Sequence, residues 1–335
     1  MQLAALLSLV CATGACACTI PVFRYALDRW EADKFHLVLP AGAAQDTALQ
    51  DVLRPLRANG KANMDITTSR DASVTMAELR NSRESSQLVW SGTLDQATLA
   101  ALLDSPARKK IVESILAGDS FIWVIADNGS PQDTAEVERI EKRLRFLEQV
   151  AALPIQDPND PDSQLGPGPS LRLKFTTLRL RSDDPAEKVL FKMLAGPKGE
   201  IDPETTSFAA PVFGKGRVLG AWPLALLDDA TLEDASMFLV GRCGCRIKNE
   251  NPGWDLLLNV DWEKALPAAA SASRVGVHSP PALAVAQTKA VPEVVTISGD
   301  SVKTEGTHKW GGVTIAGVLF GIVLVIVVVY RLRKP

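Results

Sequence analysis

The alternation of apolar and polar residues predicts a regular series of helices and strands along most of the chain. Residues 35–39 are predicted to form a strand, and residues 121–126 are a continuous apolar run, which is typical of a buried central strand. Residues 133–153 instead repeat apolar side chains every three or four positions, as an amphipathic helix does. Strands and helices therefore follow one another at short intervals, which indicates an α/β fold.

From residue 121 onward, the predicted elements follow the order β-α-β-α-β-β-α. Residues 208–213 and 217–222 lie on either side of Gly214-Lys215-Gly216, so we expect a hairpin there. This order indicates a layered α/β arrangement whose final two strands are antiparallel.

Pro211 is placed at the head of the third strand in that order. The order and this proline together resemble the minimal thioredoxin fold over residues 119 to 243. The resemblance implies thioredoxin-like layers, a cis peptide bond before Pro211, and an active-site dithiol beside this proline. The first half, with a helix after Cys18 and a strand at residues 35–39, is a candidate for a second, less regular copy, although its sequence shows no clean repeat.

The chain departs from the thioredoxin pattern where the family carries its C-x-x-C. A thiol after the first strand would be activated by the N-terminus of the following helix. This chain has Asp127-Asn128-Gly129-Ser130 there, and none of these residues carries a thiol. We therefore expect the standard oxidoreductase position to be empty.

The first seventeen residues are predicted to be a signal peptide. An apolar stretch is followed by Ala15-Cys16-Ala17, which fits a cleavage site and would leave Cys18 as the first mature residue. Residues 13–16 also fit a lipoprotein site, in which Cys16 would be acylated. The segment before the apolar stretch carries no Lys or Arg, so an uncleaved anchor stays an alternative.

Near the other end, residues 310–330 are predicted to be a transmembrane helix. Residues 311–330 are apolar and uncharged, and twenty helical residues cross a bilayer core of about 30 Å. Arg331, Arg333 and Lys334 follow at once, so the tail at residues 331–335 is expected in the cytoplasm and the body outside. This arrangement resembles exported single-pass membrane proteins of bacteria, and the resemblance implies no activity.

Three regions are predicted between the two terminal segments. Residues 18–118 form an N-terminal α/β region, and residues 119–265 form the thioredoxin-like region. Residues 266–309 are rich in Ala, Pro and Ser and lack a long periodic pattern, which is typical of a flexible stalk.

Charge and composition exclude several classes of function. The net charge of -3, with acids and bases interspersed, gives no basic face for nucleic acid. Of three histidines, only His36 lies in the predicted body, so a Ser-His-Asp or Cys-His hydrolase is not expected. The glycines around Lys215 join two strands, so they do not form a dinucleotide loop, and we expect no cofactor.

Cys243 and Cys245 are the remaining candidates for chemistry. One or both could bridge to Cys18 and tie the mature N-terminus to the body. Alternatively, the Cys-Gly-Cys pair could exchange disulfides, with Pro211 nearby if the resemblance holds, or bind a metal together with Cys18.

The expected function is a membrane-tethered extracytoplasmic binding or assembly module without an evident catalytic site, contacting the membrane through residues 311–330 and an unidentified protein partner. The alternative is a thiol-disulfide exchange or metallothiol protein that uses Cys243 and Cys245. The scarcity of histidine and the missing dithiol favour the first interpretation over an enzyme.

Overall fold

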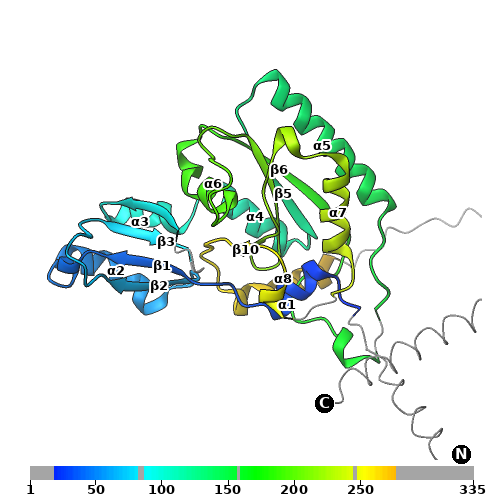
Figure 1. Cartoon of the computed structure of the whole chain (residues 1–335). Helices are drawn as coiled ribbons and strands as arrows, with labels where there is room; N and C mark the ends of the chain where they lie inside the picture. The colour runs from blue at the N-terminus through cyan, green and yellow to red at the C-terminus, as the bar shows by residue number, and fades with distance from the viewer. Residues whose placement is uncertain (1–18, 82–86, 157–158, 244–246, 277–335) are drawn as a thin grey trace, which may run out of the picture. The chain divides into compact units, whose positions relative to one another are not determined.

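A computed structural model describes residues 19–81, 87–156, 159–243 and 247–276. These residues form a mixed α/β structure with two mixed sheets (Figure 1). The predicted signal peptide, the transmembrane segment, the cytoplasmic tail, Cys18 and Cys245 lie outside the described residues. Within the described ranges, no helix combines the length and the apolar character needed to cross a membrane.

The first sheet has the strand order β2-β1-β3-β4. Strand β1 is parallel to β2 and antiparallel to β3, and β3 is antiparallel to β4. In β1, Phe35, Leu37 and Leu39 are buried and alternate with the half-buried His36 and Val38, as period-two patterning requires. The elements of this region are β1 (Phe35–Leu39), α2 (Thr47–Asn59), β2 (Met64–Thr68), β3 (Ala77–Arg80), β4 (Leu88–Gly92), α3 (Gln96–Leu103) and α4 (Pro106–Leu116).

The second sheet has the order β10-β8-β7-β5-β6, and β9 pairs with β7 beside this path. Strand β5 is parallel to β6 and antiparallel to β7, and β7 is antiparallel to β8. The predicted order β-α-β-α-β-β-α is confirmed, with β9 added before the last helix. The elements are β5 (Phe121–Asp127), α5 (Pro131–Val150), β6 (Phe175–Arg181), α6 (Lys188–Ala195), β7 (Phe208–Phe213), β8 (Arg217–Val218), β9 (Trp222–Pro223), α7 (Asp229–Val240) and β10 (Trp254–Asp255).

The two sheets share the same topology over four strands. The order β2-β1-β3-β4 repeats as β6-β5-β7-β8, and the parallel and antiparallel pairings correspond one to one. Helix α6 connects β6 to β7, whereas a short loop connects β2 to β3. The repeat therefore lies in strand topology, which a search for sequence periodicity does not detect.

Strand β5 is buried on both faces and separates two clusters of apolar side chains. Phe121, Trp123 and Ile125 pack in the cluster that includes α5 and α7. Ile122 and Val124 point to the opposite face, into the cluster that includes α4, α6 and the first sheet. A continuous apolar run is what a strand covered on both faces needs, as the sequence predicted.

The N-terminal helix α1 (Val22–Arg29) packs against α7 and β7. The amide of Val22 donates to the carbonyl of Gly241 at 3.0 Å, and the amide of Cys243 donates to the carbonyl of Ile20 at 3.0 Å. The segment that precedes the first sheet is thus bonded to the chain that follows α7.

Helix α8 (Trp262–Gly276) packs against α4 and begins before the predicted stalk. Residues 266–276 of that stalk are therefore helical, and the rest of the stalk lies outside the described residues. The composition and the missing period of residues 266–309 predicted an irregular segment, but the alanines after Pro267 have high helix propensity and continue the helix.

Pro211 corrects an expectation drawn from the thioredoxin resemblance. The described residues contain no cis peptide bond, and Pro211 lies inside β7, opposite Trp123, rather than at its head. Its carbonyl accepts a hydrogen bond from the amide of Leu219 at 3.1 Å. Pro211 thus lies between the two short stretches in which β7 pairs with β8 and with β9. A residue without an N–H fits there because the ladder is interrupted at that point.

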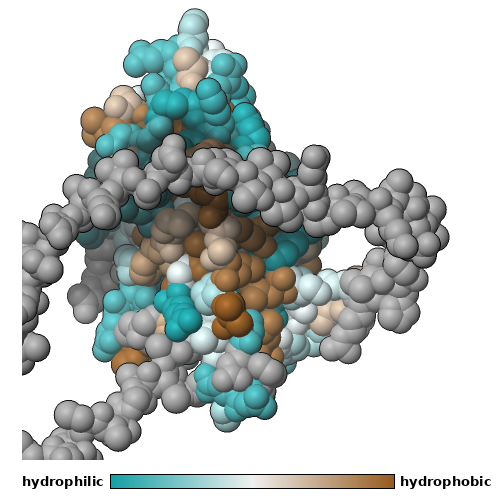
Figure 2. Space-filling view, turned by 90° about the vertical axis from the view of Figure 1, so that its right-hand side faces the viewer, coloured by the Kyte–Doolittle hydropathy of each residue, from teal (hydrophilic) through white to brown (hydrophobic). Residues whose placement is uncertain are grey.

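Figure 2 views the side of the molecule that carries α5 and α7, and a brown apolar area lies in its middle, bordered by teal hydrophilic surface. Large apolar side chains exposed on these two helices are Phe146, Val150 and Phe238. Scattered exposed apolar residues are common on soluble folds and do not by themselves mark a site.

Candidate functional site

The turn after β5 holds an ion pair where the thioredoxin pattern would carry thiols. The carboxylate of Asp127 is buried and accepts from Arg179 Nε at 2.8 Å and from Arg179 Nη2 at 2.9 Å. It also accepts from the amide of Gly129 at 2.8 Å. Ser130 caps α5 by accepting from the amide of Asp133 at 3.1 Å, so the helix start is closed by side chains of this turn.

The ion pair fixes the charge state of both partners. The hydrogen bonds from Arg179 hold the pKa of the Asp127 carboxyl below its ordinary value, and Asp127 in turn raises the pKa of Arg179. A carboxylate bonded in this way stays ionised at neutral pH and has no proton to donate. The turn is therefore built as a salt-bridged structural element.

Cys243 lies just beyond α7 and is buried, with 2% of its surface exposed. It packs in the apolar cluster that also contains Phe23, Ala26 and Leu239. The structure thus places Cys243 beside the N-terminal segment, whereas Pro211 lies in the middle of β7. Among the described residues, no group of three His, Cys, Asp or Glu side chains is placed to hold a metal ion.

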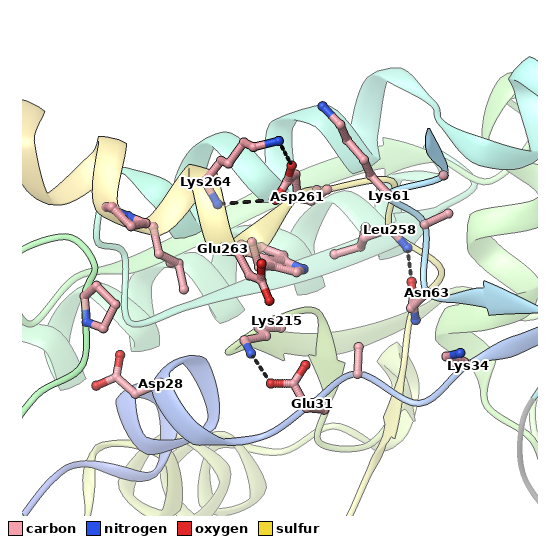
Figure 3. Close-up of a pocket in the computed structure, with 18 of the residues that line it drawn as sticks. Asp28, Glu31, Lys34, Lys61, Asn63, Lys215, Leu258, Asp261, Glu263 and Lys264 are labelled. Atoms are coloured by element: carbon pink, nitrogen blue, oxygen red, sulfur yellow. Dashed lines mark hydrogen bonds and ion pairs between the residues drawn. The ribbon is translucent and has the colours of Figure 1, made fainter. Parts of the chain in front are cut away.

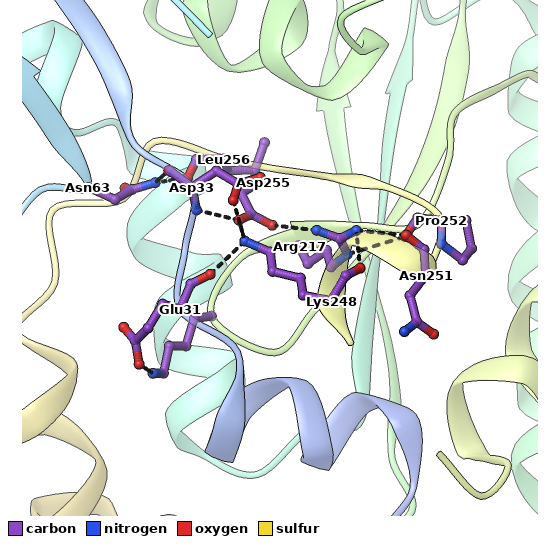
Figure 4. Close-up of polar contacts among 10 residues, drawn as sticks. Glu31, Asp33, Asn63, Arg217, Lys248, Asn251, Pro252, Asp255 and Leu256 are labelled. Atoms are coloured by element: carbon purple, nitrogen blue, oxygen red, sulfur yellow. Dashed lines mark hydrogen bonds and ion pairs between the residues drawn. The ribbon is translucent and has the colours of Figure 1, made fainter. Parts of the chain in front are cut away.

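A cluster of buried and half-buried charges joins three distant segments of the chain (Figure 4). Arg217, from the start of β8, donates to Asp255 Oδ1 at 3.2 Å and to the carbonyl of Asn251 at 2.9 Å. Lys248 bonds the other oxygen of Asp255 and lies 2.7 Å from Asp33 Oδ1. Asp255 is thus held between two cations.

The same cluster fixes the chain that enters the first sheet. The amide of Asp33 donates to Asp255 at 2.6 Å, and Lys248 donates to the carbonyl of Glu31 at 2.5 Å. The guanidinium of Arg217 lies 5.4 Å from the ring centre of Trp30. Buried charges are tolerated when they are paired and hydrogen-bonded in this way, so the cluster is an anchor for residues 30–33.

A second buried group of polar residues fixes the start of α4. Glu187 accepts from Ser105 Oγ at 2.6 Å and from the amide of Ala107 at 2.8 Å. Arg108 donates to the carbonyls of Leu102 and Ala101, each at 2.7 Å. Burial lowers the pKa of Arg108 to about 10, so this side chain remains charged at neutral pH and its role is structural.

Next to the anchor lies a cavity of about 680 Å³, which we call the α8 cavity (Figure 3). Five segments line it: the end of α1 and the chain after it, the chain between α2 and β2, the loop at Pro167, the turn at Lys215, and the chain from Leu258 into α8. Its charged lining residues are Asp28, Glu31, Lys34, Lys61, Lys215, Asp261, Glu263 and Lys264. Its volume lies within the range of about 300–1,000 Å³ that is usual for small-molecule sites.

Asp28 is the most unusual residue of this cavity. Its side chain is completely buried, and Oδ2 accepts from Arg24 Nε at 3.0 Å and from the amide of Gly166 at 2.8 Å. The other oxygen, Oδ1, is also buried, and no hydrogen-bond partner reaches it from the described residues. Buried carboxylate oxygens are nearly always hydrogen-bonded, so this atom is an exception, as are four other buried polar atoms of the described residues, among them Trp123 Nε1 and Ser236 Oγ.

Sequence reasoning identified Cys243 and Pro211 but missed Asp28, Glu263 and the charged anchor. The contacts of the anchor join residues that lie between 7 and 222 positions apart in the chain, so no local motif contains them all. One weak signal existed: the acids and bases of residues 28–34 directly follow a predicted amphipathic helix.

No protein-family model matches the chain, and neither any curated protein nor any solved structure matches it.

Proposed function

We propose that this protein is a membrane-tethered extracytoplasmic binding module, with thioredoxin-like layers, no catalytic dithiol, and residues 311–330 as its anchor. The observation that carries the proposal is the Asp127–Arg179 ion pair at the strand-to-helix turn where the thioredoxin pattern needs thiols. A paired, ionised carboxylate in this position gives structure but no redox chemistry.

The strand topology supports the comparison with thioredoxin. In the minimal thioredoxin fold, a parallel pair of strands is extended on one side by an antiparallel hairpin. The order β6-β5-β7-β8 has that arrangement, and β2-β1-β3-β4 repeats it. Two such layers without active thiols suit a binding role, since the fold then supplies surfaces and a cavity rather than a reactive centre.

The α8 cavity supports binding as the activity. It is lined by charged, polar and apolar groups from five chain segments, which is the mixed lining typical of ligand sites. Cys243, by contrast, lies in an apolar cluster, where a thiol is poorly exposed to a disulfide substrate.

The test compares disulfide exchange by the full chain and by the variant with Cys243→Ser and Cys245→Ser, both in membranes, with a fluorescent glutathione disulfide as substrate. A binding module gives equal background rates for both proteins. Exchange by the wild-type chain that disappears in the double variant would overturn the proposal and establish the thiol-disulfide alternative.

Membrane topology is tested separately. Protease added to spheroplasts that express the chain is expected to digest the body and leave the tail at residues 331–335 protected. A body that resists protease until the membrane is lysed contradicts the extracytoplasmic placement.

A further inference from the structure

Helix α5 exposes one stripe of side chains, and the character of this stripe changes halfway along the helix. In the first half the exposed residues are Pro131, Gln132, Ala135 and Glu138. In the second half they are Lys142, Arg145, Phe146, Gln149 and Val150, which share one face because they are three or four positions apart. The outer face of a solvated helix is normally polar, yet 49% of Phe146 and 59% of Val150 are exposed.

Phe238 of α7 lies beside the second half of this stripe. Two ion pairs connect the helices, Arg139–Asp229 and Arg143–Glu233, and both join residues 90 positions apart. Helices α5 and α7 therefore run parallel, and Phe238, which is 37% exposed, comes level with the turn from Phe146 to Val150. We call Phe146, Val150 and Phe238 the α5–α7 patch. Figure 2 shows an apolar area on the side that carries these two helices.

The charges around the α5–α7 patch are more basic than acidic. Glu233 is already paired with Arg143 at 2.6 Å. The other exposed charges near the patch are Lys142, Arg145 and Arg242 against Asp234. The half-buried Glu141 lies 3.6 Å from Arg145, so a small positive excess remains. Large apolar side chains with a basic rim are typical of surfaces that lie on an anionic bilayer.

The chain enters the body at the end of the same helix. Gln156, which follows α5, donates through Nε2 to the carbonyl of Thr19 at 2.8 Å. Thr19 donates through Oγ1 to Ser163 Oγ at 2.7 Å. Ile155, beside Gln156, is 87% exposed. The chain that precedes Thr19 therefore leaves the body next to an exposed apolar residue, at the end of α5 that carries the patch.

The sequence before Thr19 is predicted to meet a membrane. An acylated Cys16 and an uncleaved apolar anchor are two of the expectations for this segment, and either one holds lipid within a few residues of Thr19. Because hydrogen bonds fix Thr19 to the body, a bilayer reached there lies close to Ile155 and to the end of α5. A lipid surface thus accounts both for the place of the exposed apolar side chains and for their basic rim.

We propose that the α5–α7 patch, together with Ile155, rests on the lipid bilayer and inserts its apolar side chains among the headgroups. This inference rests on the membrane tether of the proposed function and names the bilayer as the partner of one face of the body. A second copy of the chain fits this face less well, because a twofold contact centred on the patch would bring two basic rims together.

The experiment uses the full-length chain reconstituted into vesicles of phosphatidylcholine and phosphatidylglycerol. The photo-crosslinking residue p-benzoylphenylalanine is placed at position 146, and mass spectrometry after irradiation measures the fraction of that peptide that carries a lipid. Position 76 is the control, because Met76 is a 53% exposed apolar residue next to β3 of the first sheet. We expect at least about fivefold more lipid adduct at position 146 than at position 76, and less adduct at position 146 in vesicles of phosphatidylcholine alone.

Val150→Ser combined with Ile155→Ser is the decisive variant, because both side chains are exposed and their loss leaves the core untouched. We expect the lipid adduct at position 146 to fall about tenfold, since two apolar side chains no longer enter the bilayer. Met76→Ser combined with Leu88→Ser is the matched control, because it removes two exposed apolar side chains outside the patch. This control should give as much lipid adduct at position 146 as the unsubstituted chain.

Equal lipid adduct at positions 146 and 76 would overturn the inference, as would an unchanged yield in the Val150→Ser and Ile155→Ser variant. A crosslink from position 146 to a second copy, or to residues 1–18 of the same chain, would overturn it in favour of that occupant. Flotation of the vesicles in a density gradient separates this result from the proposed function. A chain that floats without lipid adduct at position 146 contradicts the inference alone, whereas a chain that does not float contradicts the proposed tether as well.

Discussion

Arg179 holds the buried carboxylate of Asp127 with two hydrogen bonds, and this pair occupies the end of the central strand β5 and its parallel neighbour β6. The Asp127 side chain has no exposed surface, whereas 38% of the Arg179 side chain is exposed. The pair therefore joins the two strands at their carboxyl ends and leaves the arginine partly accessible to solvent.

Asp127→Asn is expected to lower the free energy of unfolding by about 1–3 kcal/mol. The substitution removes the charge that Arg179 binds, and the partial exposure of Arg179 keeps the loss below that of a fully buried pair. Urea denaturation of the detergent-solubilised chain measures this change. Asp183→Asn is the control, because the Asp183–Arg181 pair is exposed on both sides, and it should leave the free energy of unfolding unchanged.

The same pair predicts a pH dependence. The folded pKa of Asp127 is lower than the unfolded value of about 3.9, so the pair stabilises the fold above that pH, and its contribution is lost as the pH falls through the folded pKa. Unfolding midpoints should fall more steeply for the wild type than for Asp127→Asn below about pH 4. If the unfolding midpoints of the two proteins fall equally steeply with pH, the Asp127–Arg179 pair is not the cause of the pH dependence.

Arg217→Met is expected to destabilise the protein by about 3 kcal/mol, because it leaves the buried Asp255 with Lys248 as its remaining cation. For a domain of this size, the melting temperature should fall by about 6–12 °C. Lys198→Met is the control, since Lys198 is exposed and pairs with the exposed Glu200, and we expect no measurable shift. Similar melting temperatures for the two variants would show that the anchor adds no stability.

Cys243 is expected to react slowly with a thiol reagent in the folded protein and quickly in urea, because its side chain is buried. Peptide mass spectrometry after timed alkylation measures labelling at Cys243 itself. Cys243→Ser should cost about 1–3 kcal/mol, since it places a hydroxyl in an apolar cluster. Rapid labelling of the folded chain would show that the thiol is accessible.

Gly253→Ala is expected to be strongly destabilising. Gly253 has a φ of 107°, and a Cβ there would lie 2.1 Å from the carbonyl oxygen of Val218. Gly199→Ala is the matched control, because Gly199 also has a positive φ, 68°, but its nearest neighbour would be 3.9 Å away. We expect about 1–2 kcal/mol for the control, from backbone conformation alone, and a clearly larger loss of unfolding free energy for Gly253→Ala. Equal losses of unfolding free energy for the two variants would show that the backbone near Val218 shifts to accommodate the added methyl group.

Most secondary structure of the second half was predictable because its patterns are local. The apolar run at β5, the amphipathic α5 and the hairpin around Lys215 were all expected from residues close together in the chain. Strand β3, with the sequence Ala-Glu-Leu-Arg, was not identified. Four residues are too few for a clear period, and this strand is defined by its pairing with β1 and β4.

The residues of the candidate site, by contrast, could not be predicted from local sequence patterns. The few cysteines of this chain stand out in the sequence, whereas lysines and acids occur throughout it. Asp28 is distinguished only by what surrounds it, which includes the amide of Gly166 at 2.8 Å. No sequence pattern around residue 28 predicts that contact.

The sequence by itself determined the order of the elements from β5 to α7 apart from β9, and the absence of thiols at the turn after β5, since both follow from residue identity and short-range spacing. Only the tertiary structure decided that two sheets share one strand order, that Arg217, Lys248 and Asp255 form one anchor, and that Asp28 and Glu263 line one cavity. The physical reason is that helix and strand periods arise from neighbours along the chain. Charge pairing and cavities depend instead on which distant segments the packing of apolar faces brings together.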